Sequence, residues 1–150
     1  MVYAKQSAEA VIDAAKEHIQ SPVEDIMKAC NEALQQKRGA AVTIVEFDYT
    51  RNEFTFCGVG NVKFHFVKHD GSTIYPLPVN GYLSGKGQSF KIRRYRYETP
   101  SRFILHTDGL SQMSHKKYLK MNMPLDYIYR TMVEGVTKKD DTTFVIGSLK

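Results

Sequence analysis

The sequence predicts an α+β fold in which helices cover an antiparallel β-sheet. Helical periodicity fills the N-terminal part of the chain, and from Ala40 onward the pattern changes to short β-rich runs separated by turn residues. Helices followed by a run of strands are typical of the α+β class. The 150 residues, of which 42% are apolar, suit one domain with one hydrophobic core.

A first helix is expected from about Ser7 to Ile19. Its apolar face consists mostly of small side chains, which suit close packing against a sheet or another helix. The residues of this face are Ala8, Val11, Ala14, Ala15 and Ile19.

The second helix has clear boundary signals. Ser21 suits the N-cap, Pro22 the first helical position, and Glu24 completes a capping box. Gly39 is a plausible stop. The apolar face that follows at helical spacing consists of Val23, Ile26, Met27, Cys30, Ala33 and Leu34.

The middle of the chain reads as a meander of antiparallel strands. Turn signals at Asp48–Asn52 and His69–Gly71 separate β-rich runs, and Gly58–Asn61 interrupts another. The expected strands are Val42–Phe47, Glu53–Cys57, Val62–Val67, Ile74–Tyr75, Phe90–Tyr97 and Arg102–Thr107. Leu125–Val133 then has helical spacing, with Pro124 near its start, and Thr143–Ile146 is a last short strand.

Charge and cysteine content narrow the class of protein. The net charge of +5 permits an acidic or phosphorylated partner without requiring nucleic acid. Cys30 and Cys57 lack metal-type spacing and fit reduced core thiols, although two cysteines do not exclude a disulfide. The chain shows neither a membrane-spanning stretch nor a signal peptide, so we expect a cytoplasmic protein.

One basic stretch, Lys91–Tyr97, is open to three interpretations. Its interleaved tyrosines could stack on nucleic-acid bases. Its charges are also typical of an edge strand, where they discourage sheet-to-sheet aggregation, and this is the preferred interpretation. A docking face for a phosphoprotein is the third.

Carboxylates stand at the ends of two expected strands. Asp108 follows the apolar run Phe103–Leu105, and Asp140 and Asp141 precede the last strand. If these strands are antiparallel neighbours, Asp108 and Asp140 meet at one rim of the sheet and could hold a hard cation such as Mg²⁺ or Mn²⁺. The alternative is an ordinary Asp-Gly turn and a solvated loop with local ion pairs.

The five histidines form no ligand motif, and no catalytic side chain is identified. His106 lies two residues before Asp108, so it points to the same side of an ideal strand. We expect it to be a polar residue at the rim rather than a proton donor.

Several motifs resemble those of a known family. HTDGLS, beginning at His106, and DDTTFVIG, beginning at Asp140, are similar to the two C-terminal motifs of the metal-dependent (PPM-type) serine/threonine phosphatases in their bacterial branch. RGAAVTIVEFDYTRNEFTFCGVGNVKF resembles the paired central strands of that branch, and PLPVNGYLSGK the loop that follows. The resemblance runs from Ala4 to Leu149.

The resemblance implies a sandwich of two antiparallel sheets flanked by helices, with two Mn²⁺ or Mg²⁺ ions at one end. It implies hydrolysis of phosphoserine or phosphothreonine without a protein nucleophile. Asp108 and Asp140 match metal ligands, whereas Asp141 matches a variable position. The implied substrates are phosphorylated regulatory proteins of the stressosome, in negative control of the general stress sigma factor pathway, with no nucleic-acid or membrane partner.

Two features depart from the family pattern. The family carries a further metal-binding Asp-Gly pair on a strand before the helix that resembles AKQSAEAVI, where this chain begins, and many relatives have histidine at the position of Asn61. We therefore expect residues 1–150 to be the C-terminal three quarters of one phosphatase domain, incomplete at the N-terminus and with little or no activity alone. A non-catalytic phosphoprotein-binding module is the alternative function, and a nucleic-acid-binding domain a third.

Overall fold

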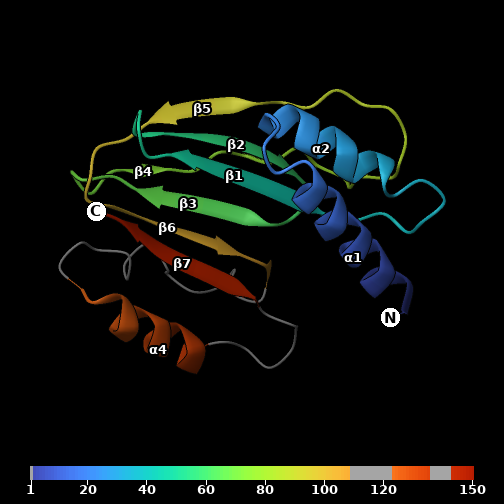
Figure 1. Ribbon diagram of the computed structural model, residues 1–150. Coiled ribbons are helices and arrows are strands. Elements are labelled where there is room, and N and C mark those ends of the chain that lie inside the picture. The colour runs from blue at the N-terminus through green and yellow to red at the C-terminus, as the bar shows by residue number, and fades with distance from the viewer. Residues whose placement is uncertain (1, 109–122, 136–142) are drawn as a thin grey trace. The chain divides into compact units, whose positions relative to one another are not determined.

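The computed structural model describes residues 2–108, 123–135 and 143–150, and it confirms the α+β class. The chain divides into two compact units. The first is built by Met1–Asp48, Glu53–Asn61 and Pro78–Tyr95, and the second by Tyr49–Asn52, Val62–Leu77 and Arg96–Lys150. Each unit has its own sheet (Figure 1).

The first unit carries helices α1 and α2 on strands β1, β2 and β5. Strand β1 pairs antiparallel with β2 from Val42 opposite Val59 to Asp48 opposite Glu53. Strand β5 lies at the edge of the order β1-β2-β5, which confirms the edge-strand interpretation of the basic stretch within the described residues. The elements are α1 Val2–Glu17, α2 Val23–Glu32, β1 Val42–Asp48, β2 Glu53–Val59 and β5 Arg93–Arg96.

The buried face of α2 is the one that its periodicity predicts. Met27 and Cys30 of α2, and Leu34 just beyond its end, are fully buried in one core cluster with Cys57 of β2. The predicted face of α1 is correct only in its middle, where Val11 and Ala14 are buried. Ile19 is exposed because the helix ends at Glu17, before Ile19 is reached, and Ala8 inside the helix is also exposed.

The predicted ends of α2 are wrong. Pro22, not Ser21, is the N-cap, and no side chain caps the helix. The reason is that Pro22 has extended backbone while its carbonyl accepts the first helical bond, from Ile26 N–H at 3.1 Å. The helix ends at Glu32, and Gly39 has another role: a Cβ there would lie 2.2 Å from the ring of Tyr82.

The second unit is a sheet of order β4-β3-β6-β7 among the described residues, with α4 packed on one face (Figure 1). The core under α4 includes Ile104 of β6 and Ile128 and Met132 of α4, all fully buried. The elements are β3 Lys63–Val67, β4 Thr73–Ile74, β6 Ser101–His106, α4 Leu125–Gly135 and β7 Phe144–Leu149.

Strand β6 pairs on both sides, which positions the candidate site. It runs antiparallel to β3, with Val67 opposite Arg102 and Lys63 opposite His106. It also runs antiparallel to β7, from Ser101 opposite Leu149 to His106 opposite Phe144. The end of β6 therefore lies beside the beginning of β7.

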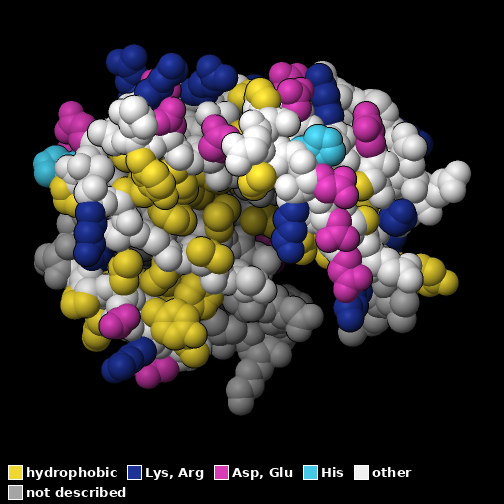
Figure 2. Space-filling model, in the orientation of Figure 1, with side chains coloured by type: hydrophobic (Ala, Val, Ile, Leu, Met, Phe, Trp, Pro, Cys, Tyr) yellow, Lys and Arg dark blue, Asp and Glu magenta, His cyan; other side chains and the backbone are white. Residues whose placement is uncertain are grey.

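Surface charges of both signs are interspersed on the face that Figure 2 shows, in keeping with the modest net charge of +5. Among the described residues, no helix has the length and apolar character that crossing a membrane requires.

Candidate metal site at the end of strand β6

Two threonines join β6 to β7 just beyond the last strand pair. Thr107 N–H donates to the carbonyl oxygen of Thr143 at 3.0 Å, and Thr143 N–H donates back to Thr107 Oγ1 at 3.0 Å. This reciprocal pair continues the strand pairing by one residue. It confirms that the two strands that carry the acidic motifs are antiparallel neighbours.

Asp108 follows this threonine pair directly and is exposed. Its carboxylate lies close enough to His106 to act on that ring electrostatically. Asp140 and Asp141 lie outside the described residues, three and two positions before Thr143. Thr143 is hydrogen-bonded to Thr107, the residue before Asp108. That Asp108 and Asp140 bind one ion together stays a prediction.

His106 is the last residue of β6, at the end of the sheet where sequence analysis placed it, and its side chain is buried, with only 1% of its surface exposed. Its Nδ1 donates to the carbonyl oxygen of Thr107 at 2.8 Å, which places the remaining lone pair of the neutral ring on Nε2. Burial is the largest cause that lowers the pKa of His106, and the positive charge of Lys63 lowers it further. The hydrogen bond to the Thr107 carbonyl and the negative charge of Asp108 raise this pKa in part. The net effect of these groups is a lowered pKa for His106.

A stack of rings beside His106 was not found by sequence reasoning. His65 lies parallel to His106, with centroids 5.4 Å apart, and to Tyr75 at 4.3 Å. His65 is opposite Ile104 in the β3–β6 register, so it shares a sheet face with His106. The sequence shows that His106 and Ile104 lie on one face of their strand. Only the observed β3–β6 register shows that His65 lies on the same face of the sheet.

The described residues fit a hard divalent cation in part. An exposed carboxylate at a strand end is a ligand that Mg²⁺ or Mn²⁺ accepts alongside retained waters. Asp108 supplies one such group, and the described residues contain no cluster of three or more His, Cys, Asp or Glu side chains able to hold an ion. Further ligands would come from the segment that contains Asp140.

Comparison with known proteins defines the family. The pattern of the family called Stage II sporulation protein E (SpoIIE) matches residues 2–149. The chain belongs to this family, and it is by family a phosphatase. It is similar to RsbX, the phosphoserine phosphatase of Bacillus subtilis (strain 168), with 38% identity over 147 residues, which cover 97% of this chain and 74% of RsbX.

Solved structures agree with this assignment. A crystal structure of RsbX in complex with magnesium superimposes with a TM-score of 0.93 at 37% identity, covering all of this chain and 76% of that one. The catalytic domain of the serine/threonine phosphatase PstP, solved with two manganese ions, has a TM-score of 0.72 over 96% of this chain and 81% of that one. At 14% identity, this likeness shows a shared fold and nothing about function.

Proposed function

We propose that this chain is a protein serine phosphatase that depends on a divalent cation and acts on phosphorylated regulators of the stress response. The observation that carries the proposal is the 38% identity to a phosphoserine phosphatase across 97% of the chain. It favours an enzyme over the non-catalytic module that the sequence alone left open. The antiparallel strand ends that carry the acidic motifs support it further.

The proposal assigns metal binding to Asp108 and Asp140, with a pair of Mn²⁺ or Mg²⁺ ions. Bound cations of this kind activate water and offset the negative charge of a phosphoryl group. The chain's own residues hold the geometry: Thr107 and Thr143 fix the strand ends, and the Nδ1 hydrogen bond of His106 fixes the backbone just before Asp108. Phosphothreonine is included as a substrate.

The same proposal covers partners and location. Phosphoproteins of the stressosome are the proposed substrates, because the chain is 38% identical to RsbX, which is named as a phosphoserine phosphatase, and because its motifs resemble those of the phosphatases that act on the stressosome. Residues 1–150 are taken as part of one phosphatase domain, with the cytoplasm as the proposed location.

The test is Asp108→Asn in the complete phosphatase domain, because residues 1–150 alone are expected to show little or no activity. The substitution keeps the size of the side chain and removes its charge. We expect Mn²⁺-dependent release of phosphate from a small aryl phosphate and from a phosphoserine peptide to fall by about 100-fold or more, because even partners of metal ligands contribute about 10–100-fold. The thermal midpoint should change little, since Asp108 is exposed. Asp13→Asn, an exposed aspartate of α1, is the matched control. Activity that survives Asp108→Asn would contradict the assignment.

A further inference from the structure

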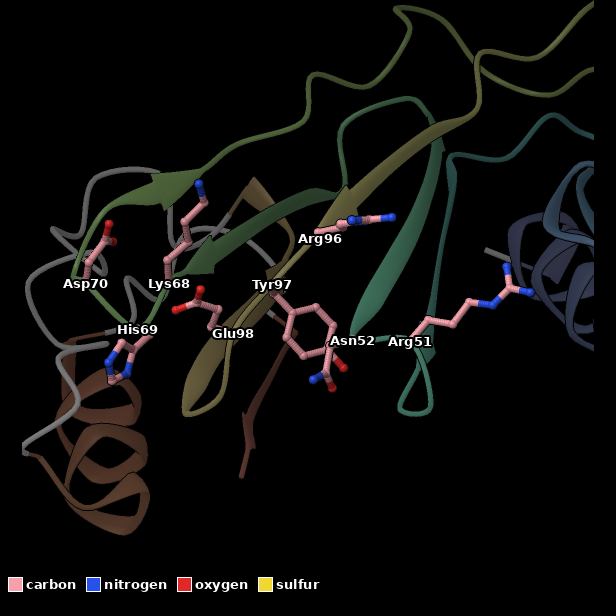
Figure 3. A pocket seen from close by; sticks show the side chains of 8 residues that line it. All are labelled: Arg51, Asn52, Lys68, His69, Asp70, Arg96, Tyr97 and Glu98. Atoms are coloured by element: carbon pink, nitrogen blue, oxygen red, sulfur yellow. The ribbon is translucent and has the colours of Figure 1, made fainter.

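A polar pocket lies at the end of the second sheet opposite Asp108. It has a volume of about 500 Å³ and is lined by side chains from three segments, which include Arg51, Lys68, Arg96, Tyr97 and Glu98 (Figure 3). We call it the distal pocket.

The β3–β6 register fixes the position of the distal pocket. Lys68 follows Val67, which is opposite Arg102 at the beginning of β6, whereas Asp108 follows the end of β6. A strand rises about 3.3 Å per residue, so the seven steps from Ser101 to Asp108 span roughly 23 Å. The distal pocket is thus separate from the candidate metal site.

One wall of the distal pocket is a turn that is closed by hydrogen bonds. Lys68 N–H donates to the carbonyl oxygen of Ser72 at 2.7 Å, and Gly71 N–H donates to that of Lys68 at 2.9 Å. The Asp70 carboxylate accepts hydrogen bonds from Ser72 N–H at 2.9 Å and Ser72 Oγ at 2.5 Å. The hydroxyl of Ser72 is the main cause that lowers the pKa of Asp70. This carboxylate is therefore engaged within its own turn.

The floor of the distal pocket is also fixed. Tyr97 is 5% exposed, its N–H donates to the carbonyl oxygen of Asn52 at 2.9 Å, and its ring lies 5.4 Å from that of Phe66. A ring buried in this way offers no open face on which a nucleic-acid base could stack.

The charges of the distal pocket favour an acidic ligand. Arg51, Lys68 and Arg96 are cationic, against Glu98 and the already engaged Asp70. In the view of Figure 3, Arg51 and Arg96 extend to one side of Tyr97, while Lys68 and Glu98 lie on the other. A peptide with acidic side chains suits this mixture, because its backbone N–H groups can donate to Glu98 while its carboxylates meet the cations.

We propose that the distal pocket binds an acidic segment of the phosphoprotein substrate, at a distance from its phosphoserine. This inference rests on the proposed function and adds a second recognition element to it. An extended peptide spans at most about 3.3–3.6 Å per residue, so about seven or more residues must separate the acidic segment from the phosphoserine. Substrates with a shorter separation engage one site or the other.

The first experiment measures binding without catalysis. A fluorescein-labelled, unphosphorylated peptide of glycine and serine with a block of glutamates is titrated with the protein, and its anisotropy is recorded at low salt. The double variant Arg51→Glu/Lys68→Glu should weaken binding by about tenfold or more, since like charges replace opposite ones. The control Lys16→Glu/Lys37→Glu makes the same charge change at exposed residues of the first unit and should bind as the wild type does.

The variant Asp108→Asn distinguishes this proposal from the proposed function. It should bind the labelled peptide as tightly as the wild type does, whether or not the protein turns over substrate. Equal weakening by the two double variants would overturn the distal pocket as the binding site. A short single-stranded oligonucleotide is added as a competitor, with its phosphate concentration equal to the carboxylate concentration of the peptide. Displacement of the peptide would also overturn the proposal and would assign the surface to nucleic acid. Circular dichroism of each variant confirms that it is folded.

The second experiment tests the separation of the two sites, and it uses the complete phosphatase domain because turnover is measured. Two phosphoserine peptides of equal composition carry the glutamate block either about seven or more residues from the phosphoserine or directly beside it. The first should have the lower KM, and Arg51→Glu/Lys68→Glu should raise that KM several-fold while kcat changes little. Equal KM values for both peptides in the wild type would overturn the proposal.

Discussion

Gly147 of β7 lies directly opposite Phe103 of β6. A Cβ at this position would come within 2.3 Å of the Phe103 ring, so the glycine of the DDTTFVIG motif has a packing role. Gly147→Ala should lower the free energy of unfolding by about 1–3 kcal/mol, the usual cost of overpacking. A denaturant titration measures it. Gly87→Ala, where a Cβ would meet nothing within 4 Å, is the control, and equal midpoints for the two variants would contradict the prediction.

Cys57 is a buried thiol in the core of the first unit. Burial, with a smaller contribution from the charge of Glu24, raises the pKa of Cys57 to about 11, from an ordinary value of 9.0. A raised thiol pKa gives stability that is full below the unfolded pKa and is lost as pH rises toward the folded one. Between about pH 9 and 11 the wild type should therefore lose at most roughly 2–3 kcal/mol more than Cys57→Ala. Parallel stability curves for the two proteins, measured by urea unfolding, would contradict this.

Single residues show what the sequence could and could not predict about the site. Asp108 could be placed at a strand end because an apolar run precedes it. His106 could not be recognised as buried, because the face that it shares with His65 depends on the β3–β6 register. The distal pocket had no sequence signal, since Arg51, Lys68 and Glu98 belong to three ordinary turn-like segments that only the fold brings together.

At the scale of elements, the threonine pair between β6 and β7 supports the candidate metal site. Thr107→Val keeps the shape of the side chain but removes the oxygen that accepts Thr143 N–H. We expect the Mn²⁺ concentration that gives half-maximal activity to rise about 10-fold, as for other groups that orient metal ligands, with a small change in the thermal midpoint.

Thr131→Val is the control for this prediction, because it also removes a threonine hydroxyl that hydrogen-bonds a backbone carbonyl, that of Tyr127 in α4. An unchanged Mn²⁺ requirement in Thr107→Val, or an equal rise in both variants, would show that the threonine pair has no part in holding the ligands.

The elements themselves were largely predictable, because β1, β2, β3 and β6 follow β-rich runs that turn residues separate. The errors lie at element ends and have physical causes. Strand β5 is shorter than the expected Phe90–Tyr97: only Arg93–Arg96 forms the strand beside β2. Helix α2 ends at Glu32, well before Gly39. Near this end the buried Asn31 accepts a hydrogen bond from Gly85 N–H and donates one to the carbonyl oxygen of Lys86. Such contacts with a distant loop leave no local signal.

At the scale of the whole molecule, the net charge of +5 should affect encounters with the proposed acidic substrates. Attraction between a basic enzyme and an acidic phosphoprotein weakens as salt shortens the Debye length from about 10 Å at 0.1 M to about 3 Å at 1 M. The value of kcat/KM for such a substrate should fall several-fold over this range, and that for a small aryl phosphate should fall less. Equal declines would mean that salt acts at the candidate metal site instead.

The two-sided pairing of β6 has a consequence for how the protein loses and regains its active geometry. Among the described residues, β6 has β3 and β7 as neighbours, whereas β7 pairs with β6 alone. Strands with one neighbour open in local fluctuations at a lower free energy than those enclosed on both sides, and amide hydrogen exchange reports this difference. Detachment of β7 would release Thr143 from Thr107 while β6 stays paired with β3. Cation release would then follow a fast sub-global opening rather than the slow unfolding of the chain.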